Sequence, residues 1–130
     1  TFKVSIMFAF IPEYQNLREV LADQKLAALG DAYVNFVYSL ALSKRKGEPV
    51  GAKVDSRLLA EALRKAELRN LLPSRIDRHK QADAAEALIV YAWVRDAMTI
   101  EEGVSILEQF EDAVEAFCSF LLAARRKISL

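Results

Sequence analysis

Two acidic residues three positions apart are the first side chains in this sequence whose types and spacing suit chemistry. Asp83 and Glu86 lie among four alanines in the stretch Gln81–Ile89, which continues as an apolar segment. Residues three apart share one face of a helix, so both carboxylates can point at one spot. Carboxylate oxygens suit a hard cation such as Mg²⁺, and the alanines leave room for a ligand. A solvated helix face produces the same pattern, so this spacing alone leaves both interpretations open.

A third acid lies inside a second, otherwise apolar stretch. Asp31 belongs to the segment 29–36, more than 50 residues before the acidic pair. We expect Asp31 to converge with that pair on one site, which would gather enough oxygen ligands for one or two hard cations. Asn35 lies one helical turn beyond Asp31, where it either completes this site or makes a structural hydrogen bond.

Hydrophobic periodicity indicates helices along the chain and no strong strand, so the predicted fold is all-α with about five main helices. Pro12-Glu13 suits the first helix start, and Asp55 or Ser56 suits the third. The expected helices cover about 13–28, 30–44, 55–68, 78–97 and 100–126, the last opened by a capping box at Thr99 and Glu102.

Length and composition predict one compact domain over residues 1–130. The chain is 53% hydrophobic, with only 4 Gly and 3 Pro and no repeat or low-complexity run to divide it. Residues 1–12 are expected to be either a leader foreign to the domain or an irregular N-terminal segment. The single cysteine, Cys118, excludes an intrachain disulfide and a cysteine-based zinc cluster, which is typical of a reducing, cytoplasmic location. No apolar run approaches the roughly 18 residues that span a bilayer, so no membrane partner is expected.

The 18 basic and 18 acidic residues balance overall but are unevenly placed. Residues 44–80 hold 11 Lys and Arg against five acids, and residues 83–115 hold nine acids and one base, Arg95. The basic middle favours a phosphate-binding surface, although two solvated helix faces of opposite charge would produce the same division. The candidate contacts to phosphate groups are Lys44, Arg45, Lys46, Lys53, Arg75, Arg78 and Lys80.

Three stretches together resemble the endonuclease domain of the ribonuclease III family. They are Leu29–Phe36 with its Leu-Gly-Asp, Val54–Leu68, and Ala82–Leu88 with Asp-x-x-Glu-Ala-Leu, in the family's order and at similar separations. The resemblance covers roughly residues 26–110. It implies an all-helical, homodimeric domain that uses Mg²⁺, with Mn²⁺ as an alternative, to cut double-stranded RNA.

The resemblance also implies roles for individual residues. Asp31, Asp83 and Glu86 match three of the family's catalytic, metal-binding carboxylates. The family's usual fourth acid, four residues before its signature Asp, is Ala27 here, and the bulky aromatic that often follows it is Ala28. The chain is similar to short members without a double-stranded-RNA-binding domain, so the catalytic domain itself is expected to hold the RNA. Under this resemblance, the seven basic residues named above as phosphate contacts are the predicted RNA contacts.

Three functions remain open at this point. The leading hypothesis is a metal-dependent endoribonuclease acting on double-stranded or structured RNA. The second is a relative that has lost catalysis and holds RNA, an interpretation favoured by Ala27. The third is another all-α metal hydrolase, such as a nucleotide pyrophosphohydrolase, although Asp31 has no acidic partner at position 27 or 35. His79 is expected to be a surface residue, and Tyr91 and Trp93 are expected to be core residues.

Overall fold

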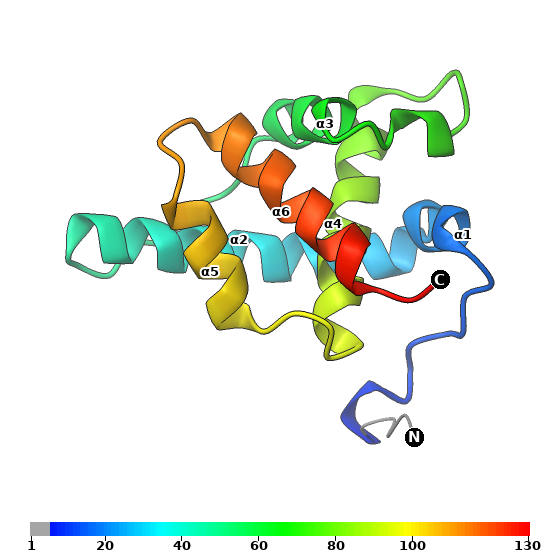
Figure 1. The fold of residues 1–130 in the computed structure, drawn as a ribbon, viewed down its shortest axis with the longest axis horizontal. Coiled ribbons are helices and arrows are strands. Elements are labelled where there is room, and N and C mark those ends of the chain that lie inside the picture. Colours follow the sequence, from blue (N-terminus) through cyan, green and yellow to red (C-terminus); the bar gives the residue numbers. More distant parts are fainter. Residues whose placement is uncertain (1–5) are drawn as a thin grey trace.

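The structure, a computed structural model, describes residues 6–130, and helices are its only regular elements in that range (Figure 1). The predicted all-α fold is confirmed, with six α-helices in this range where about five were expected. The α-helices are α1 (Leu17–Ala22), α2 (Gln24–Lys46), α3 (Ser56–Lys65), α4 (Arg78–Val94), α5 (Ile100–Glu108) and α6 (Ala113–Lys127), and the short 3₁₀ helices are η1 (Ile6–Phe8) and η2 (Arg69–Leu71).

Helix α4 forms the centre of the core. Every residue from Ala84 to Ala92 is buried, and α1, α2, α3 and α6 all pack against this helix. A helix that is apolar on all sides is stable only when other elements surround it, as they do here. Glu86 is the one charged residue in this buried stretch, so the fold carries a carboxyl group into its own core.

Helix α2 crosses α4 at a glycine, and α2 packs against α4 more extensively than any other pair of helices (Figure 1). A Cβ atom built on Gly30 would lie 2.2 Å from the carbonyl oxygen of Glu86. No side chain fits at that distance, so the absence of one allows the two backbones to come together. The crossing therefore places Asp31, the next residue, beside the buried stretch of α4.

The predicted boundary between the first two helices is wrong. The first helix was expected over about 13–28 and the second from Gly30, but the chain breaks at Asp23 instead. The Asp23 carboxylate caps α2 by accepting hydrogen bonds from the backbone N–H groups of Lys25 (2.9 Å) and Leu26 (3.1 Å). It also accepts one from the Tyr14 hydroxyl (2.6 Å), so a contact outside the helix stabilises the cap.

The last predicted helix, 100–126, is also wrong as a single element. It divides into α5 and α6, because Asp112 caps α6 by accepting a hydrogen bond from the backbone N–H of Val114 (3.0 Å). Helices α3 and α4 begin where predicted, with Asp55 as the cap of α3, and each ends three residues earlier than expected.

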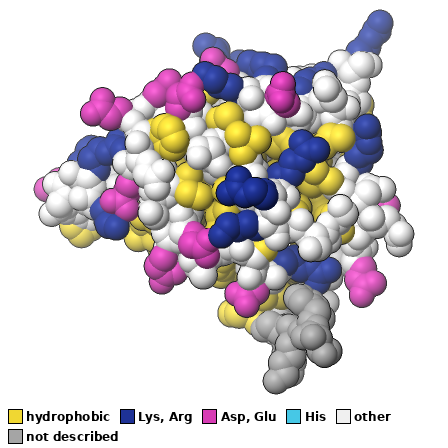
Figure 2. Space-filling view, in the orientation of Figure 1, with side chains coloured by type: hydrophobic (Ala, Val, Ile, Leu, Met, Phe, Trp, Pro, Cys, Tyr) yellow, Lys and Arg dark blue, Asp and Glu magenta, His cyan; other side chains and the backbone are white. Residues whose placement is uncertain are grey.

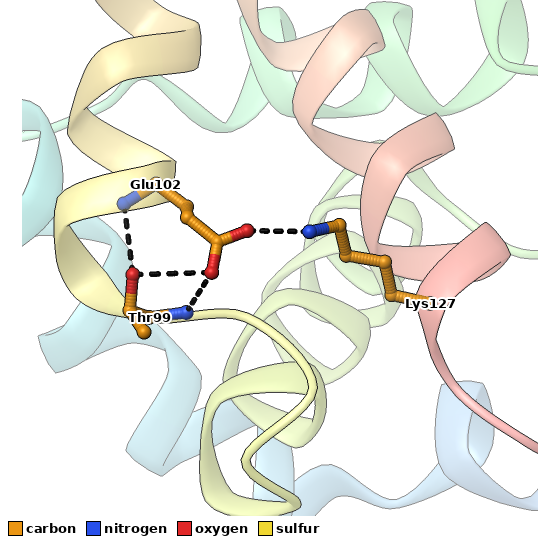
Figure 3. A network of polar contacts seen from close by, with 3 residues as sticks. All are labelled: Thr99, Glu102 and Lys127. Atoms are coloured by element: carbon orange, nitrogen blue, oxygen red, sulfur yellow. Dashed lines mark hydrogen bonds and ion pairs between the residues drawn. The ribbon is translucent and has the colours of Figure 1, made fainter.

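The capping box predicted for residues 99–102 is present at the start of α5 (Figure 3). The backbone N–H of Glu102 donates to the Thr99 hydroxyl (3.1 Å), and the backbone N–H of Thr99 donates to the Glu102 carboxylate (3.2 Å). The second oxygen of Glu102 pairs with the Lys127 ammonium group at the end of α6. The cap therefore also ties α5 to α6.

Aromatic contacts join the segment before α1 to the core. The Phe8 ring meets Trp93 edge to face at 5.2 Å, and Trp93 stacks on Tyr33 at 4.9 Å. Tyr91 is buried and Trp93 is half-buried, in agreement with their prediction as core residues. The predicted irregular segment 1–12 contains η1, and its first five residues lie outside the described part of the chain.

Helix α2 is long and apolar enough, by length and composition, to cross a membrane, whereas the sequence predicted no such segment. Its apolar residues Leu26, Val34 and Val37 are buried in the core of this domain. Internal packing against α4 and α5 accounts for these buried residues, whereas Ala28, Ala32 and Phe36 on the same helix are exposed.

Candidate active site

Three helices meet at a cavity of about 410 Å³ that contains all three predicted catalytic acids. Asp31 comes from α2, and Asp83 and Glu86 come from α4. Exposure decreases from Asp31, which is exposed, through Asp83 to Glu86, which is only 7% exposed. The other lining residues are Gln24, Ala27, Ala28, Val54, Ser56, Leu59, His79 and Ala82.

The crossing at Gly30 brings the acids of different helices together. The carboxyl group of Glu86, when protonated, donates a hydrogen bond to the carboxylate of Asp31. Asp83 lies three residues before Glu86 on the same face of α4, so it adds a third carboxyl group to the cavity. The expected convergence of Asp31 with the acidic pair is therefore present as a shared cavity, while their catalytic and metal-binding roles remain predictions.

The electrostatics of the cavity oppose the ionisation of its carboxyl groups. Burial, the hydrogen bond with Asp31 and the negative charges of Asp31 and Asp83 together raise the pKa of Glu86 to about 8. Burial, followed by the charge of Asp77, also raises the pKa of Asp83, with His79 acting in the opposite direction. Ionisation of all three carboxyl groups would therefore leave negative charge that the residues of the cavity do not neutralise, and a cation would relieve this repulsion.

A row of polar residues on α2 positions Asp31 and binds the loop of residues 50–54. Asn35 donates a hydrogen bond to the Asp31 carboxylate (3.2 Å) and accepts one from the backbone N–H of Val54 (2.7 Å). Of the two roles predicted for Asn35, the structure shows the structural hydrogen bond. The row continues at four-residue spacing, because Ser39 and Ser43 accept hydrogen bonds from the backbone N–H groups of Ala52 and Val50, respectively, both at 2.9 Å.

The spacing of the polar residues on α2 matches the spacing of the loop residues that bond to them. Four residues of a helix rise about 6 Å, and two residues of an extended chain span roughly 6.6 Å, so alternate loop residues meet successive turns of α2. The loop runs antiparallel to α2, and its end at Val54 and Ser56 reaches the cavity. The polar row therefore sets where α3 begins relative to Asp31.

His79 lies at the cavity, which the sequence did not predict. It is an exposed residue, as expected, but it lines the site and its positive form lowers the pKa of Asp83. The signal in the sequence is its spacing, since His79 and Asp83 are four apart on one helix face. Gln24 and Ser56 also line the cavity, and no sequence motif indicated them.

The cavity has the donor chemistry for a hard cation, since carboxylate oxygens are the ligands that Mg²⁺ prefers. Within residues 6–130, however, no three His, Cys, Asp or Glu side chains are gathered closely enough to hold a metal ion in this structure. Ala27 occupies the wall of the cavity where the ribonuclease III resemblance expects a fourth acid. The cavity therefore matches a hard cation in the chemical type and the negative charge of its side chains, and not in their present spacing.

The predicted RNA contacts fall into two groups. Lys44 forms an ion pair with Glu108 (2.8 Å), and Arg45 donates to the backbone carbonyls of Glu108 (3.4 Å) and Phe110 (3.1 Å), so both tie α2 to the end of α5. Lys44 lies thirteen residues beyond Asp31, about 20 Å along α2. The others are exposed and make no side-chain hydrogen bond or ion pair with a described residue: Lys46, Lys53, Arg75, Arg78 and Lys80.

The described chain is thus an all-helical domain in which carboxyl groups from two crossing helices share one cavity. A family model described as ribonuclease III matches residues 24–123 of this chain. The chain therefore belongs to the ribonuclease III family, as the resemblance of its three stretches predicted, and family membership supports a ribonuclease that acts on RNA. A comparison with curated proteins found no match.

Proposed function

We propose that the chain is a metal-dependent endoribonuclease that hydrolyses phosphodiester bonds in double-stranded or structured RNA. The observation that carries this proposal is the meeting of Asp31, Asp83 and Glu86 in one cavity. Burial, the hydrogen bond with Asp31 and the charges of Asp31 and Asp83 raise the pKa of Glu86 there to about 8. Family membership over residues 24–123 supports RNA as the substrate.

Asp31 and Glu86 would hold Mg²⁺ or Mn²⁺, with Asp83 as a further ligand or as an acceptor that orients water. When bound, the ion would supply an activated water and stabilise the leaving oxygen, which the chemistry of phosphodiester hydrolysis requires. The residues of the chain prepare that site. Asn35 holds Asp31 in place, the buried walls limit access of bulk water to Glu86, and His79 offers a ring N–H at the mouth of the cavity.

Cleavage of both strands of a duplex requires two sites related by a two-fold axis, so we propose a homodimer. The exposed residues Ala28, Ala32 and Phe36 follow one face of α2, and Phe36 is 55% exposed. Such a stripe suits close packing against a second copy. Sedimentation velocity at micromolar concentration is expected to show a dimer, and a monomer alone would count against cleavage of duplexes.

One observation favours a second candidate, a family member that binds RNA without cutting it. Ala27 lines the cavity and is 4% exposed, so its methyl group occupies the position of an expected carboxylate. One metal ligand fewer reduces the affinity for the cation.

Incubation of the protein with long double-stranded RNA in Mg²⁺, and separately in EDTA, tests the proposal. We expect metal-dependent cleavage by the parent, its loss in Glu86→Gln, and retention of RNA binding in both. The matched control is Glu61→Gln, because Glu61 is an exposed acid on α3 that does not line the cavity. Binding without cleavage by the parent at every Mg²⁺ and Mn²⁺ concentration would favour the second candidate.

A further inference from the structure

A second cavity, of about 440 Å³, adjoins the carboxylate cavity and has a different character. Gln24 lines both cavities, so the two are neighbours at the start of α2. Helix α1 lies beside η2 and α4, and the groove runs between α1 and the segment that leads from η2 into α4. Its floor is apolar and consists of Leu21, Leu71, Leu72, Pro73 and Ile76.

Two cations border this apolar floor. Arg18 is on α1 and Lys80 is on α4, and both line the groove. Both are exposed, and neither side chain makes a hydrogen bond or an ion pair with a described residue. Other exposed cations such as Lys46 and Lys53 are also unpaired within the described residues, so the feature that distinguishes Arg18 and Lys80 is their place beside an apolar floor. An apolar floor with two cations at its edge complements a ligand that is flat and apolar on one side and anionic on the other.

The position of Lys80 connects the groove to the proposed reaction centre. Lys80 precedes Asp83 by three residues on α4, which corresponds to about 4.5 Å along the helix axis. A phosphate bound by Lys80 would therefore be close to a phosphodiester at the carboxylates. A nucleotide has the required chemistry, since its base buries apolar faces and its phosphate pairs with Arg or Lys.

We infer that the groove between α1 and the segment 72–76 is a subsite for one unpaired nucleotide that neighbours the phosphodiester held at the carboxylate cavity. The base lies on the aliphatic floor, and Arg18 and Lys80 hold the adjoining phosphate. A base inside a stacked duplex cannot enter a groove of this kind, so the subsite selects RNA with an unpaired nucleotide beside the helical region. This inference rests on the proposed function for its substrate class.

The test compares two RNA ligands, a blunt duplex and the same duplex with a short unpaired tail, in EDTA so that nothing is cleaved. We expect the parent to bind the tailed RNA about tenfold more tightly than the blunt one, the effect of one or two charge-assisted contacts. The preference is expected to disappear in Arg18→Gln/Lys80→Gln, which removes the cations, and in Ala22→Phe, which fills the groove from an exposed position.

The matched control is Arg125→Gln/Arg126→Gln, which removes two exposed charges from the last turn of α6. Neither residue lines the groove or the carboxylate cavity. Figure 2 shows that Lys and Arg side chains lie among apolar and acidic ones on the face viewed there. This control is expected to keep the tail preference. Circular dichroism melting of every variant confirms that each has folded.

Equal affinity of the parent for the two RNAs, or an unchanged preference in the groove variants, would overturn the inference. Binding of poly-glutamate with no tail preference would also overturn it and assign the groove to an acidic protein partner. Cleavage in Mg²⁺ is measured separately with the same RNAs. A parent that shows the tail preference but never cleaves would refute the proposed function while supporting the subsite.

Discussion

The raised pKa of Glu86 makes the stability of the metal-free protein depend on pH, and Glu86→Gln should remove that dependence. In the folded protein Glu86 releases its proton at a pH of about 8, against 4.5 for an unperturbed glutamate. Between these values the unfolded chain has released the proton and the folded protein still holds it. Unfolding then releases a proton, so the free energy of unfolding decreases as pH rises from about 4.5 and levels off above about 8.

The size of the effect follows from the shift in pKa. A rise from 4.5 to about 8 corresponds to about 5 kcal/mol if the whole shift is expressed. Entry of water and relaxation of the cavity reduce the penalty on a buried carboxylate, so we expect a measured loss of about 2 to 4 kcal/mol. Glu86→Gln has no proton to lose at this position. Its free energy of unfolding should therefore lack the part of the decrease that Glu86 contributes over the same range.

Urea unfolding in EDTA, followed by circular dichroism from pH 5 to pH 9, measures this loss for the parent and the variant. The difference between the two curves isolates Glu86 and its coupling to Asp31 and Asp83. Mg²⁺ added at the upper end of the range should restore stability to the parent and not to Glu86→Gln, because binding to the folded state adds stability by mass action. Parallel curves for the two proteins would refute the electrostatic account of the cavity.

Three further outcomes follow from the structure. Lys44→Ala/Arg45→Ala/Lys46→Ala should weaken RNA binding and lower its salt dependence in filter-binding assays, with less than about 1 kcal/mol lost in unfolding because these contacts are exposed; unchanged binding at every salt concentration would remove this end of α2 from the RNA surface. Asn35→Ala should cost about 1 to 2 kcal/mol in urea unfolding and slow cleavage more than it weakens RNA affinity, since it frees Asp31 and leaves the N–H of Val54 unpaired; an equal fall in both would deny it a positioning role. Gly30→Ala should lower the unfolding free energy by about 3 kcal/mol or more, because its Cβ would overlap the carbonyl of Glu86; a thermal melt like the parent's would disprove the close crossing.

Local signals account for the parts of the fold that the sequence predicts well. The capping box at Thr99 and Glu102 and the cap at Asp55 each involve residues within three positions, so their chemistry can be read directly from the chain. The periodicity of apolar residues likewise reports helix type wherever one face is buried. The family motifs added the three acids of the cavity and their order.

Non-local contacts account for the parts that the sequence did not predict. Asp23 breaks the chain between α1 and α2 with help from Tyr14, nine residues away, and Gly30 looks like a helix boundary until α4 is placed beneath it. Lys44 and Arg45 read as free cations in the basic middle, but residues more than 60 positions later engage them. Hydrophobic periodicity depends on neighbouring residues and composition on none in particular, so neither predicts contacts between distant residues.

A residue without a side chain thus determines the electrostatics of the candidate site. Because Gly30 has no Cβ, α2 and α4 approach closely enough for Asp31 to bond with Glu86. A wider crossing would separate Asp31 from the pair on α4 and expose Glu86 to water, which would favour its ionisation. The close crossing buries Glu86 among like charges, and that excess charge is what a divalent cation would neutralise. The motif specifies which acids are present, and the close packing at Gly30 brings them into one cavity.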